Sequence, residues 1–245
     1  MGFYEERLYP ILEKTADALL ETEHMQNIIN GTMPLERFQF QLRQNFNYLK
    51  DFSRCWAIGL ARCNDYDEMS LWYASLKGVF EQELGESLRY WADASGASIE
   101  SMENETMAEG KRSYTSHELA RAWEGDNSMQ IMAQFPCTIL YLLFAEKACP
   151  KCTLPEDNMY RHWLFFYISD WYREHCERSI KLVNKLAEHK SPEHLARMEE
   201  ACAISCNYEL LQFENLYNKE QTWPLPEIMP DKKRTISTWD VWNNK

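Results

Sequence analysis

The stretch "AQFPCTILYLLFAEKA", from Ala133 to Ala148, is the most apolar segment of a chain that is otherwise polar and acidic. It is shorter than the roughly 20 residues that span a bilayer, so we expect a helix of a globular fold over about residues 128–147. Within it, Cys137 directly follows Pro136, and Tyr141 comes four residues later. The pattern leaves two interpretations of Cys137 open: a small buried hydrophobe or a nucleophile held in a pocket.

The rest of the chain also has helical spacing, and no segment alternates convincingly with a period of two residues. Only 8 glycines and 9 prolines occur in 245 residues, which disfavours a turn-rich β fold. We expect one all-α domain over residues 1–220, followed by an irregular, proline-rich tail over 221–245. The expected helices cover about 3–30, 34–56, 67–93, 113–125, 128–147, 155–188 and 191–217, and a connection with a short helical piece covers 97–111.

These helices carry apolar residues on more than one narrow face, and 13% of all residues are aromatic. This composition predicts a bundle with a lined cavity, or an oligomer that buries additional faces.

Composition also restricts partners and location. The formal charge of −12 argues against a nucleic-acid or anionic-membrane surface, because both need a basic patch. The N-terminus has acidic residues where a signal peptide needs a basic and then an apolar run, so we expect a cytoplasmic protein with its eight cysteines reduced. The motif "CPKC" at Cys149–Cys152 has no second pair at zinc-ligand spacing, and we interpret it as two loop thiols.

No motif for a metal, cofactor or phosphate group is found. The sequences around His175 and His194 do not supply the two Glu-x-x-His pairs of a two-metal bundle. The serine-hydrolase, dinucleotide-binding and P-loop motifs are also missing from the sequence. We therefore expect neither a metal site nor a cofactor.

The candidate site residues are polar groups on apolar helix faces. Burying a carboxylate costs several kcal/mol unless it is paired or its pKa shifts. Glu209, inside "ISCNYELLQF", is therefore either a site residue or a carboxylate that points to water or caps a neighbouring helix. The other candidates are Asn45 and Tyr48, three residues apart; Cys137 and Tyr141, four apart; and Tyr167 inside "HWLFFYISDWY".

Several segments together resemble one known family. The segments that carry the resemblance are His24 followed by "NGTMPLERF", then "QNFNYLKDFSR", "SYTSHELARA", "PCTILYLLFAEK", "YRHWLFFYISDWY" and "ISCNYELLQFENLY". They occur in that order over about residues 5–220. On these residues the chain resembles the TenA family, also called thiaminase II or aminopyrimidine aminohydrolase. The resemblance implies a haem-oxygenase-like helical bundle around a central pocket, assembled as a homotetramer or homodimer.

The resemblance also implies an activity and residue roles. These enzymes hydrolyse thiamin or its aminopyrimidine breakdown products to hydroxymethylpyrimidine, which is a step of thiamin salvage. Cys137 would be the nucleophile, with Tyr141 near the thiol, and Glu209 would bind the pyrimidine edge and shuttle a proton. Tyr48, Tyr114 and Tyr167 would line the pocket.

Two positions depart from the family pattern. Asn45 stands where the family has an aspartate that helps to bind the aminopyrimidine, and Ser87 stands where a histidine is frequent. A neutral amide offers a donor and an acceptor but no charge. Two alternatives therefore stay open beside a thiamin-salvage hydrolase: an enzyme of the same fold acting on a different amino-heterocycle or amide, and a non-catalytic protein that binds a small molecule.

Overall fold

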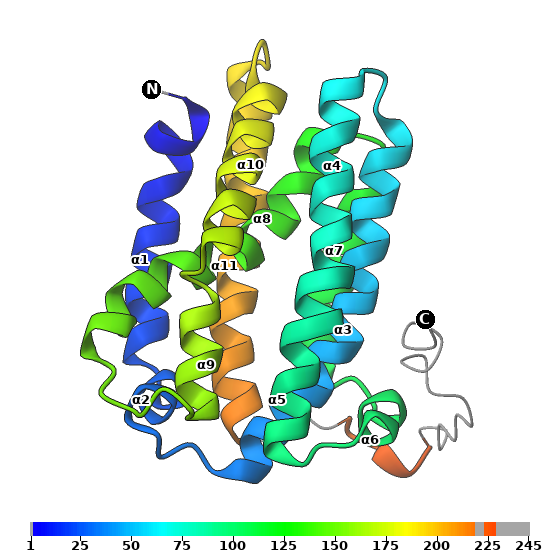
Figure 1. Ribbon diagram of the computed structural model, residues 1–245. Helices are drawn as coiled ribbons and strands as arrows, with labels where there is room; N and C mark the ends of the chain where they lie inside the picture. The colour runs from blue at the N-terminus through cyan, green and yellow to red at the C-terminus, as the bar shows by residue number, and fades with distance from the viewer. Residues whose placement is uncertain (1, 219–222, 229–245) are drawn as a thin grey trace.

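A computed structural model describes residues 2–218 and 223–228, and these residues form helices joined by short connections, with no strand among them (Figure 1). The predicted all-α fold is confirmed. The long helices are α1 (Tyr9–Glu21), α3 (Leu35–Arg62), α4 (Tyr66–Gly78), α7 (Glu109–Trp123), α8 (Asn127–Ala148), α10 (Asp170–Ala187) and α11 (Pro192–Asn218). The short elements are η1 (Tyr4–Leu8), α2 (Glu23–Asn30), η2 (Val79–Ser87), α5 (Leu88–Ser95), α6 (Ile99–Asn104), η3 (Cys149–Lys151), α9 (Met159–Phe166) and η4 (Pro226–Ile228).

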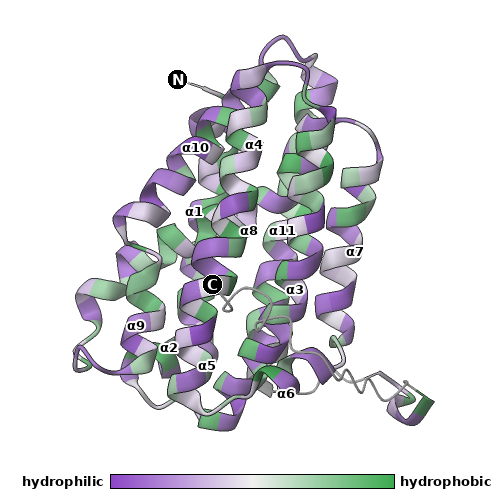
Figure 2. Ribbon diagram, turned by 45° about the vertical axis from the view of Figure 1, so that its right-hand side comes forward, coloured by the Kyte–Doolittle hydropathy of each residue, from purple (hydrophilic) through white to green (hydrophobic). Residues whose placement is uncertain are grey.

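Helix α8, which contains the most apolar stretch of the sequence, is the centre of the bundle. It packs against α1, α7, α10 and α11, and it also contacts α3. By length and composition the segment Asn127–Lys151 could cross a membrane, but 83% of its apolar window is buried inside the fold. In Figure 2 the hydrophobic residues lie mainly where the helices face one another. The apolar stretch is therefore the core helix of the bundle.

Two segments that were each expected to form one helix are interrupted, and these two predictions are wrong. The helix expected over 3–30 is interrupted at Thr22, whose backbone is extended and whose side chain accepts a hydrogen bond from the Met25 amide. The helix expected over 155–188 stops after Phe166 and starts again at Asp170, where Ser169 accepts from the Tyr172 amide. Hydroxyl side chains compete for backbone donors and favour helix starts, so each of these two residues caps the helix that follows it.

The helix expected over 67–93 is continuous, but its middle part is wider than an α-helix. Residues Val79–Ser87 form the π-helical segment η2 between α4 and α5. A Cβ added at Gly85 would lie 2.9 Å from the Phe80 carbonyl oxygen, so this wide turn needs glycine there. Segments of this kind are frequent at functional sites, and η2 contributes Glu83 to the cavity described below.

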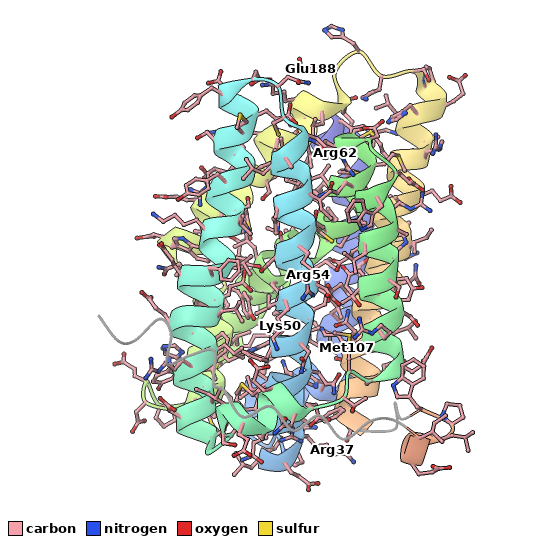
Figure 3. All side chains as sticks on the ribbon, turned by 90° about the vertical axis from the view of Figure 1, so that its right-hand side faces the viewer. Arg37, Lys50, Arg54, Arg62, Met107 and Glu188 are labelled. Atoms are coloured by element: carbon pink, nitrogen blue, oxygen red, sulfur yellow. The ribbon has the colours of Figure 1, made fainter. Side chains whose placement is uncertain are left out.

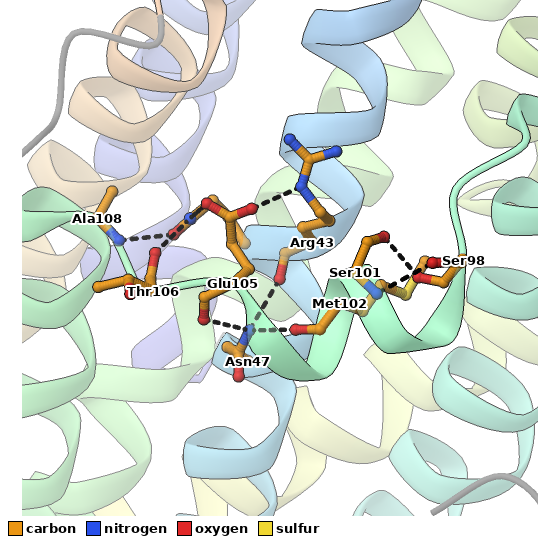
Figure 4. Close-up of polar contacts among 9 residues, drawn as sticks. Arg43, Asn47, Ser98, Ser101, Met102, Glu105, Thr106 and Ala108 are labelled. Carbon is orange, nitrogen blue, oxygen red and sulfur yellow. Dashed lines mark hydrogen bonds and ion pairs between the residues drawn. The ribbon is translucent and has the colours of Figure 1, made fainter. Parts of the chain in front are cut away.

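The connection expected over 97–111 contains α6 and fastens the start of α7 to α3 (Figure 4). The Asn47 amide donates to the Met102 carbonyl oxygen at 2.9 Å. The Gln44 side chain donates to the Thr106 carbonyl at 2.9 Å and accepts from the Ala108 amide at 2.8 Å. These bonds fix the axial position of α7, and thereby of Tyr114, relative to α3.

Part of the predicted tail is described. Trp223 donates its indole N–H to the Met107 carbonyl at 3.1 Å, so this residue reaches the connection before α7. Residues 229–245 of the expected tail lie outside the described residues, and the division at residue 220 stays a prediction.

The close contact of α3 and α4 depends on Gly59. A Cβ added there would lie 2.3–2.6 Å from ring carbons of Trp72, which is fully buried. Gly59→Ala should therefore lower the free energy of unfolding by about 1–3 kcal/mol through overpacking, although alanine has the better helix propensity by about 1 kcal/mol. Urea unfolding measures the change.

The matched control for Gly59→Ala is the same substitution in a Trp72→Leu background, where the indole ring is gone. Alanine at position 59 should then be neutral or stabilising relative to Trp72→Leu alone, because only its helix propensity remains. An equal loss of stability in both backgrounds would contradict the packing explanation.

Candidate functional site

A cavity in the interior of the bundle collects most of the polar groups predicted from the sequence. Its wall is formed by side chains from α3, η2, α8, α10 and the turn after α9. The lining residues are Asn45, Leu49, Phe52, Glu83, Cys137, Thr138, Tyr141, Tyr167 and Tyr172. The structure thus brings together four predicted site residues that come from three separate regions of the sequence.

The cavity is narrow, with a volume of about 20 Å³. That volume holds about one water molecule and is too small for a six-membered ring with substituents. Aromatic side chains make up much of the wall, and the Tyr141 and Tyr167 rings lie 4.7 Å apart between their centroids. A heterocyclic ligand would therefore enter only with displacement of wall side chains.

Cys137 lies on α8 at the wall of this cavity. It is deeply enclosed but retains some accessible surface, as expected for a side chain that borders an internal space. Burial raises the pKa of its thiol, and nearby Glu209 and Glu118 raise the pKa further, while the Tyr48 hydroxyl acts in the opposite direction. The thiol is therefore protonated at neutral pH and needs a base beside it to become nucleophilic.

The position of Cys137 is fixed by contacts of the α8 backbone. Pro136 cannot donate a backbone hydrogen bond, and α8 continues through it. One residue after Cys137, the Thr138 carbonyl accepts from the Tyr172 hydroxyl at 2.9 Å and from the Cys176 thiol at 3.6 Å. These contacts attach this turn of α8 to α10.

Glu209 is buried on α11, with only 1% of its surface exposed, so it does not point to water. Burial raises the pKa of its carboxyl, and four neighbours oppose that shift: first Lys111, then Tyr114, Cys137 and Tyr141. Neither carboxylate oxygen makes a hydrogen bond of standard geometry with a described residue. The hydroxyls and the thiol thus favour the charged form of Glu209, and the carboxyl and the Cys137 thiol influence each other's pKa.

Tyr48 and Tyr114 are fully buried in a stack of rings beside Cys137. Tyr48 stacks on Phe52 at 5.4 Å and on Tyr114 at 5.6 Å, and Tyr114 stacks on Tyr208 at 5.4 Å. The Tyr48 hydroxyl donates to Glu118 Oε1 at 2.8 Å. The stack connects α3, α7 and α11 and holds the Tyr48 hydroxyl near the thiol.

Sequence reasoning missed three charged residues of this region: Glu83, Lys111 and Glu118. Glu118 comes four residues after Tyr114 and so lies on the same helix face, which was an available signal. Lys111 comes three residues before Tyr114, on that face too, but a lysine is rarely buried. Nothing in the local sequence marks Glu83, because the π-helical turn that presents it has no alternating or helical signature.

Glu83 is deeply enclosed, yet it keeps some accessible surface because it borders the cavity. Burial raises the pKa of its carboxyl to about 8. At neutral pH it is therefore mainly a neutral acid that can donate a hydrogen bond. Together with Asn45, it gives this part of the wall polar groups without a charge.

Other predicted features lie outside the cavity. Cys149 and Cys152 are both buried with free thiols, and Cys149 is in the short helix η3 rather than in a loop. Ser87, at the end of η2, is buried and is not among the lining residues. Within the described part of the chain, no group of three or more His, Cys, Asp or Glu side chains is arranged to hold a metal ion.

Solved structures share the fold of this chain. A TenA homologue from P. horikoshii OT3 superimposes with a TM-score of 0.80 at 21% identity, covering 89% of this chain and 99% of that one. A TenA homologue from Pyrococcus furiosus superimposes with a TM-score of 0.77 at 21% identity, covering 88% and 100% of the two chains.

Sequence relatives agree with the structural ones. The chain is 30% identical over 196 residues to the aminopyrimidine aminohydrolase of Bacillus subtilis, covering 80% of this chain and 82% of the relative. It is 28% identical to the enzyme of the same name from Halalkalibacterium halodurans, covering 81% and 88%. The profile of the TENA/THI-4/PQQC family matches residues 12–218. The protein therefore belongs to the TENA/THI-4/PQQC family.

Proposed function

We propose that this protein is a cytoplasmic hydrolase that acts on thiamin or an aminopyrimidine breakdown product of thiamin and releases hydroxymethylpyrimidine. The observation that carries the proposal is the Cys137 thiol at the wall of an aromatic cavity, with the carboxyl of Glu209 beside it. The relatives named as aminopyrimidine aminohydrolases support the same activity.

The first chemical step is nucleophilic addition by Cys137. Its proton passes to the carboxylate of Glu209, and the sulfur forms a bond to a ring carbon of the pyrimidine, which leaves an extra electron pair on the ring. That pair expels the leaving amine: the C–N bond to the methylene group breaks, and the amine leaves with the bonding electron pair and takes the proton that Glu209 received from Cys137. A thiol suits this role because its anion is a strong nucleophile that also leaves readily.

Water completes the reaction. It adds to the methylene carbon, and one of its protons goes to the carboxylate of Glu209. The ring then expels the sulfur of Cys137, which takes that proton from Glu209. The carboxyl of Glu209 thus accepts and returns a proton twice in each cycle, a role that suits a group whose pKa is raised by burial.

Recognition of the ring is assigned to the neutral part of the wall. The Asn45 amide can pair with an amino group and an adjacent ring nitrogen through one acceptor and one donor. The rings of Tyr141 and Tyr167 would stack against the heterocycle, and Tyr48 and Tyr114 support the wall from the buried stack.

The chemistry of the cysteines supports a cytoplasmic location. All eight are free thiols, which is the state expected in a reducing compartment. The assembly that fits the family resemblance is a homotetramer or homodimer, and sedimentation of the purified protein measures it.

A second candidate follows from Asn45. Because this residue supplies no charge, the pocket also suits an amino-heterocycle or amide with a different hydrogen-bond pattern. The same thiol and carboxyl would then act on that substrate.

Replacing the nucleophile tests the covalent step. Cys137→Ser should abolish release of ammonia from the aminopyrimidine, because a serine hydroxyl is far less acidic than a thiol. The melting temperature should change little, because the oxygen replaces sulfur at a cavity wall. The control is Cys152→Ser, which changes a buried cysteine after η3 that is not among the residues lining the cavity, and this variant should keep its turnover.

Alkylation gives a second readout for the same thiol. Iodoacetamide should modify Cys137, and an aminopyrimidine ligand should slow that modification. Cys63, which is also partly accessible but distant in the fold, serves as the internal reference, and its labelling should not respond to the ligand. Full turnover in Cys137→Ser would rule out the covalent mechanism.

Restoring the carboxylate at position 45 tests the substrate. If the substrate is an aminopyrimidine, Asn45→Asp should raise turnover by roughly tenfold, which corresponds to about 1.4 kcal/mol of barrier. The gain should increase with pH through the pKa of the new carboxyl, because only its ionised form stabilises a protonated ring. Ammonia release measured across pH, beside the melting temperature, decides the outcome.

The control for Asn45→Asp is Asn207→Asp, which adds the same charge on an exposed part of α11. It should change neither turnover nor its pH dependence. No gain in Asn45→Asp, together with a lower melting temperature, would favour the second candidate, because the added charge would then be buried without a partner.

A further inference from the structure

Glu83 is an acidic side chain of the cavity wall with no partner in the described part of the chain. It lines the cavity from η2, and its carboxyl makes no hydrogen bond or ion pair with a described residue. Helix α3 packs against η2 and carries cations along its length, among them Lys50 and Arg54 (Figure 3). Lys50 pairs with Glu103 at 2.8 Å, and Arg54 pairs with Asp51. The Glu83 carboxyl is therefore available to a group that enters the cavity.

The π-helical segment η2 separates Glu83 from the other acids beside it. The backbone hydrogen bonds of such a segment span five residues instead of four, so its side chains leave the regular α-helical positions. Glu81 and Glu86 lie on the same segment and are exposed, whereas Glu83 reaches the cavity. Only one of the three acids of η2 is therefore placed to meet a ligand.

Asn45 is a second polar group of this wall without a partner. It comes from α3, and its amide makes no hydrogen bond with a described residue. Because α3 and η2 pack against each other, Asn45 and Glu83 reach the cavity from adjacent elements. Thr138 also lines the cavity, but its hydroxyl oxygen is almost completely enclosed. Apart from the Cys137 thiol and the tyrosine hydroxyls, Asn45 and Glu83 therefore supply the hydrogen-bonding groups of the described wall.

The chemistry of a ring amino group explains why two such groups are needed. The amino group has two N–H bonds in the plane of the ring. If the Asn45 amide donates to the adjacent ring nitrogen, its single carbonyl oxygen accepts one of these two N–H groups. The other N–H is then enclosed and needs its own acceptor, because a buried donor without a partner pays its full desolvation penalty. A carboxyl has an acceptor oxygen in both of its protonation states, so Glu83 fits this role whether or not it is ionised.

We propose that Glu83 is a substrate-binding and specificity-determining residue: its carboxyl accepts the second N–H of the ring amino group, while Asn45 binds the first N–H and the adjacent ring nitrogen. The ligand class is a planar amino-heterocycle with an unsubstituted amino group beside a ring nitrogen. The inference rests on the proposed function for the choice of an aminopyrimidine as ligand, and it concerns binding rather than turnover.

Binding of two ligands that differ only in the amino group tests this role. The probes are hydroxymethylpyrimidine and its analogue with hydrogen in place of the ring amino group, and titration calorimetry measures both dissociation constants. Glu83→Met removes the acceptor and keeps much of the side-chain length. It should weaken binding of hydroxymethylpyrimidine about tenfold or more, which corresponds to about 1.4 kcal/mol. Binding of the analogue should change by less than about twofold, because the lost contact is specific to the amino group.

Glu83→Gln separates the acceptor from the charge. The amide keeps a carbonyl oxygen and cannot ionise, so the affinity for hydroxymethylpyrimidine should stay within about twofold of the wild-type value. A role of Glu83 in packing alone would instead make Glu83→Met bind both ligands more weakly. The analogue thus reports whether the cavity of each variant is intact.

Glu86 offers a matched control on the same segment. It is exposed, and it is not among the residues that line the cavity. Glu86→Met removes the same charge from η2 and should leave the affinities for both ligands unchanged.

Three results would overturn the role of Glu83. They are equal weakening of both ligands in Glu83→Met, an unchanged affinity for hydroxymethylpyrimidine in that variant, and a loss of about tenfold in Glu83→Gln. A wild-type protein that does not bind hydroxymethylpyrimidine would overturn it as well. A wild-type protein that binds this ligand but releases no ammonia from an aminopyrimidine would disprove the proposed hydrolysis alone, and the two ligands would still decide the role of Glu83.

Discussion

The enclosure of α8 on all sides is the constraint on which the rest of this structure depends. A helix whose apolar residues face every direction is stable in water only when neighbours cover all of them, and α1, α7, α10 and α11 do so. The same enclosure removes water from any polar group on α8 and its neighbours. Cys137 is therefore deprived of solvent because of the fold, and its chemistry depends on the few polar side chains that surround it.

Removal of water acts on every acid of the site. Burial alone would protonate Glu83, Glu118 and Glu209 alike. Lys111, Tyr114, Cys137 and Tyr141 oppose the rise of the Glu209 pKa, and the Tyr48 hydroxyl and Lys111 oppose the rise of the Glu118 pKa. The aromatic stack of Phe52, Tyr48, Tyr114 and Tyr208 holds these groups in place, and the bonds from Asn47 and Gln44 set the position of α7. Packing far from the thiol thus positions the groups that act on these carboxyls.

The limits of sequence reasoning follow from the same physics. Helical periodicity predicts the fold class and the core helix, because burial of α8 leaves a direct signature in composition. The breaks at Thr22 and Ser169 are decided by single hydroxyl caps, which the surrounding apolar pattern conceals. Cys137, Tyr141, Tyr167 and Asn45 could be predicted to share a pocket through the family resemblance. Lys111 and Glu83 could not, because a buried lysine looks like a solvated one in sequence and a π-helical turn has no periodic signal.

The distribution of polar groups also bears on the neutral side chain of Asn45. On the wall that faces a ligand, Asn45 is neutral and Glu83 is mainly protonated at neutral pH. The buried side chains of Glu209 and Lys111 are not among the lining residues. A ring bound in the cavity would meet hydrogen-bond donors and acceptors from Asn45 and Glu83. Such a site favours a substrate that enters neutral and acquires its proton during the reaction, rather than one that binds already protonated. A neutral amide at position 45 therefore fits a pocket that receives a neutral ring, with the thiol of Cys137 at the same wall.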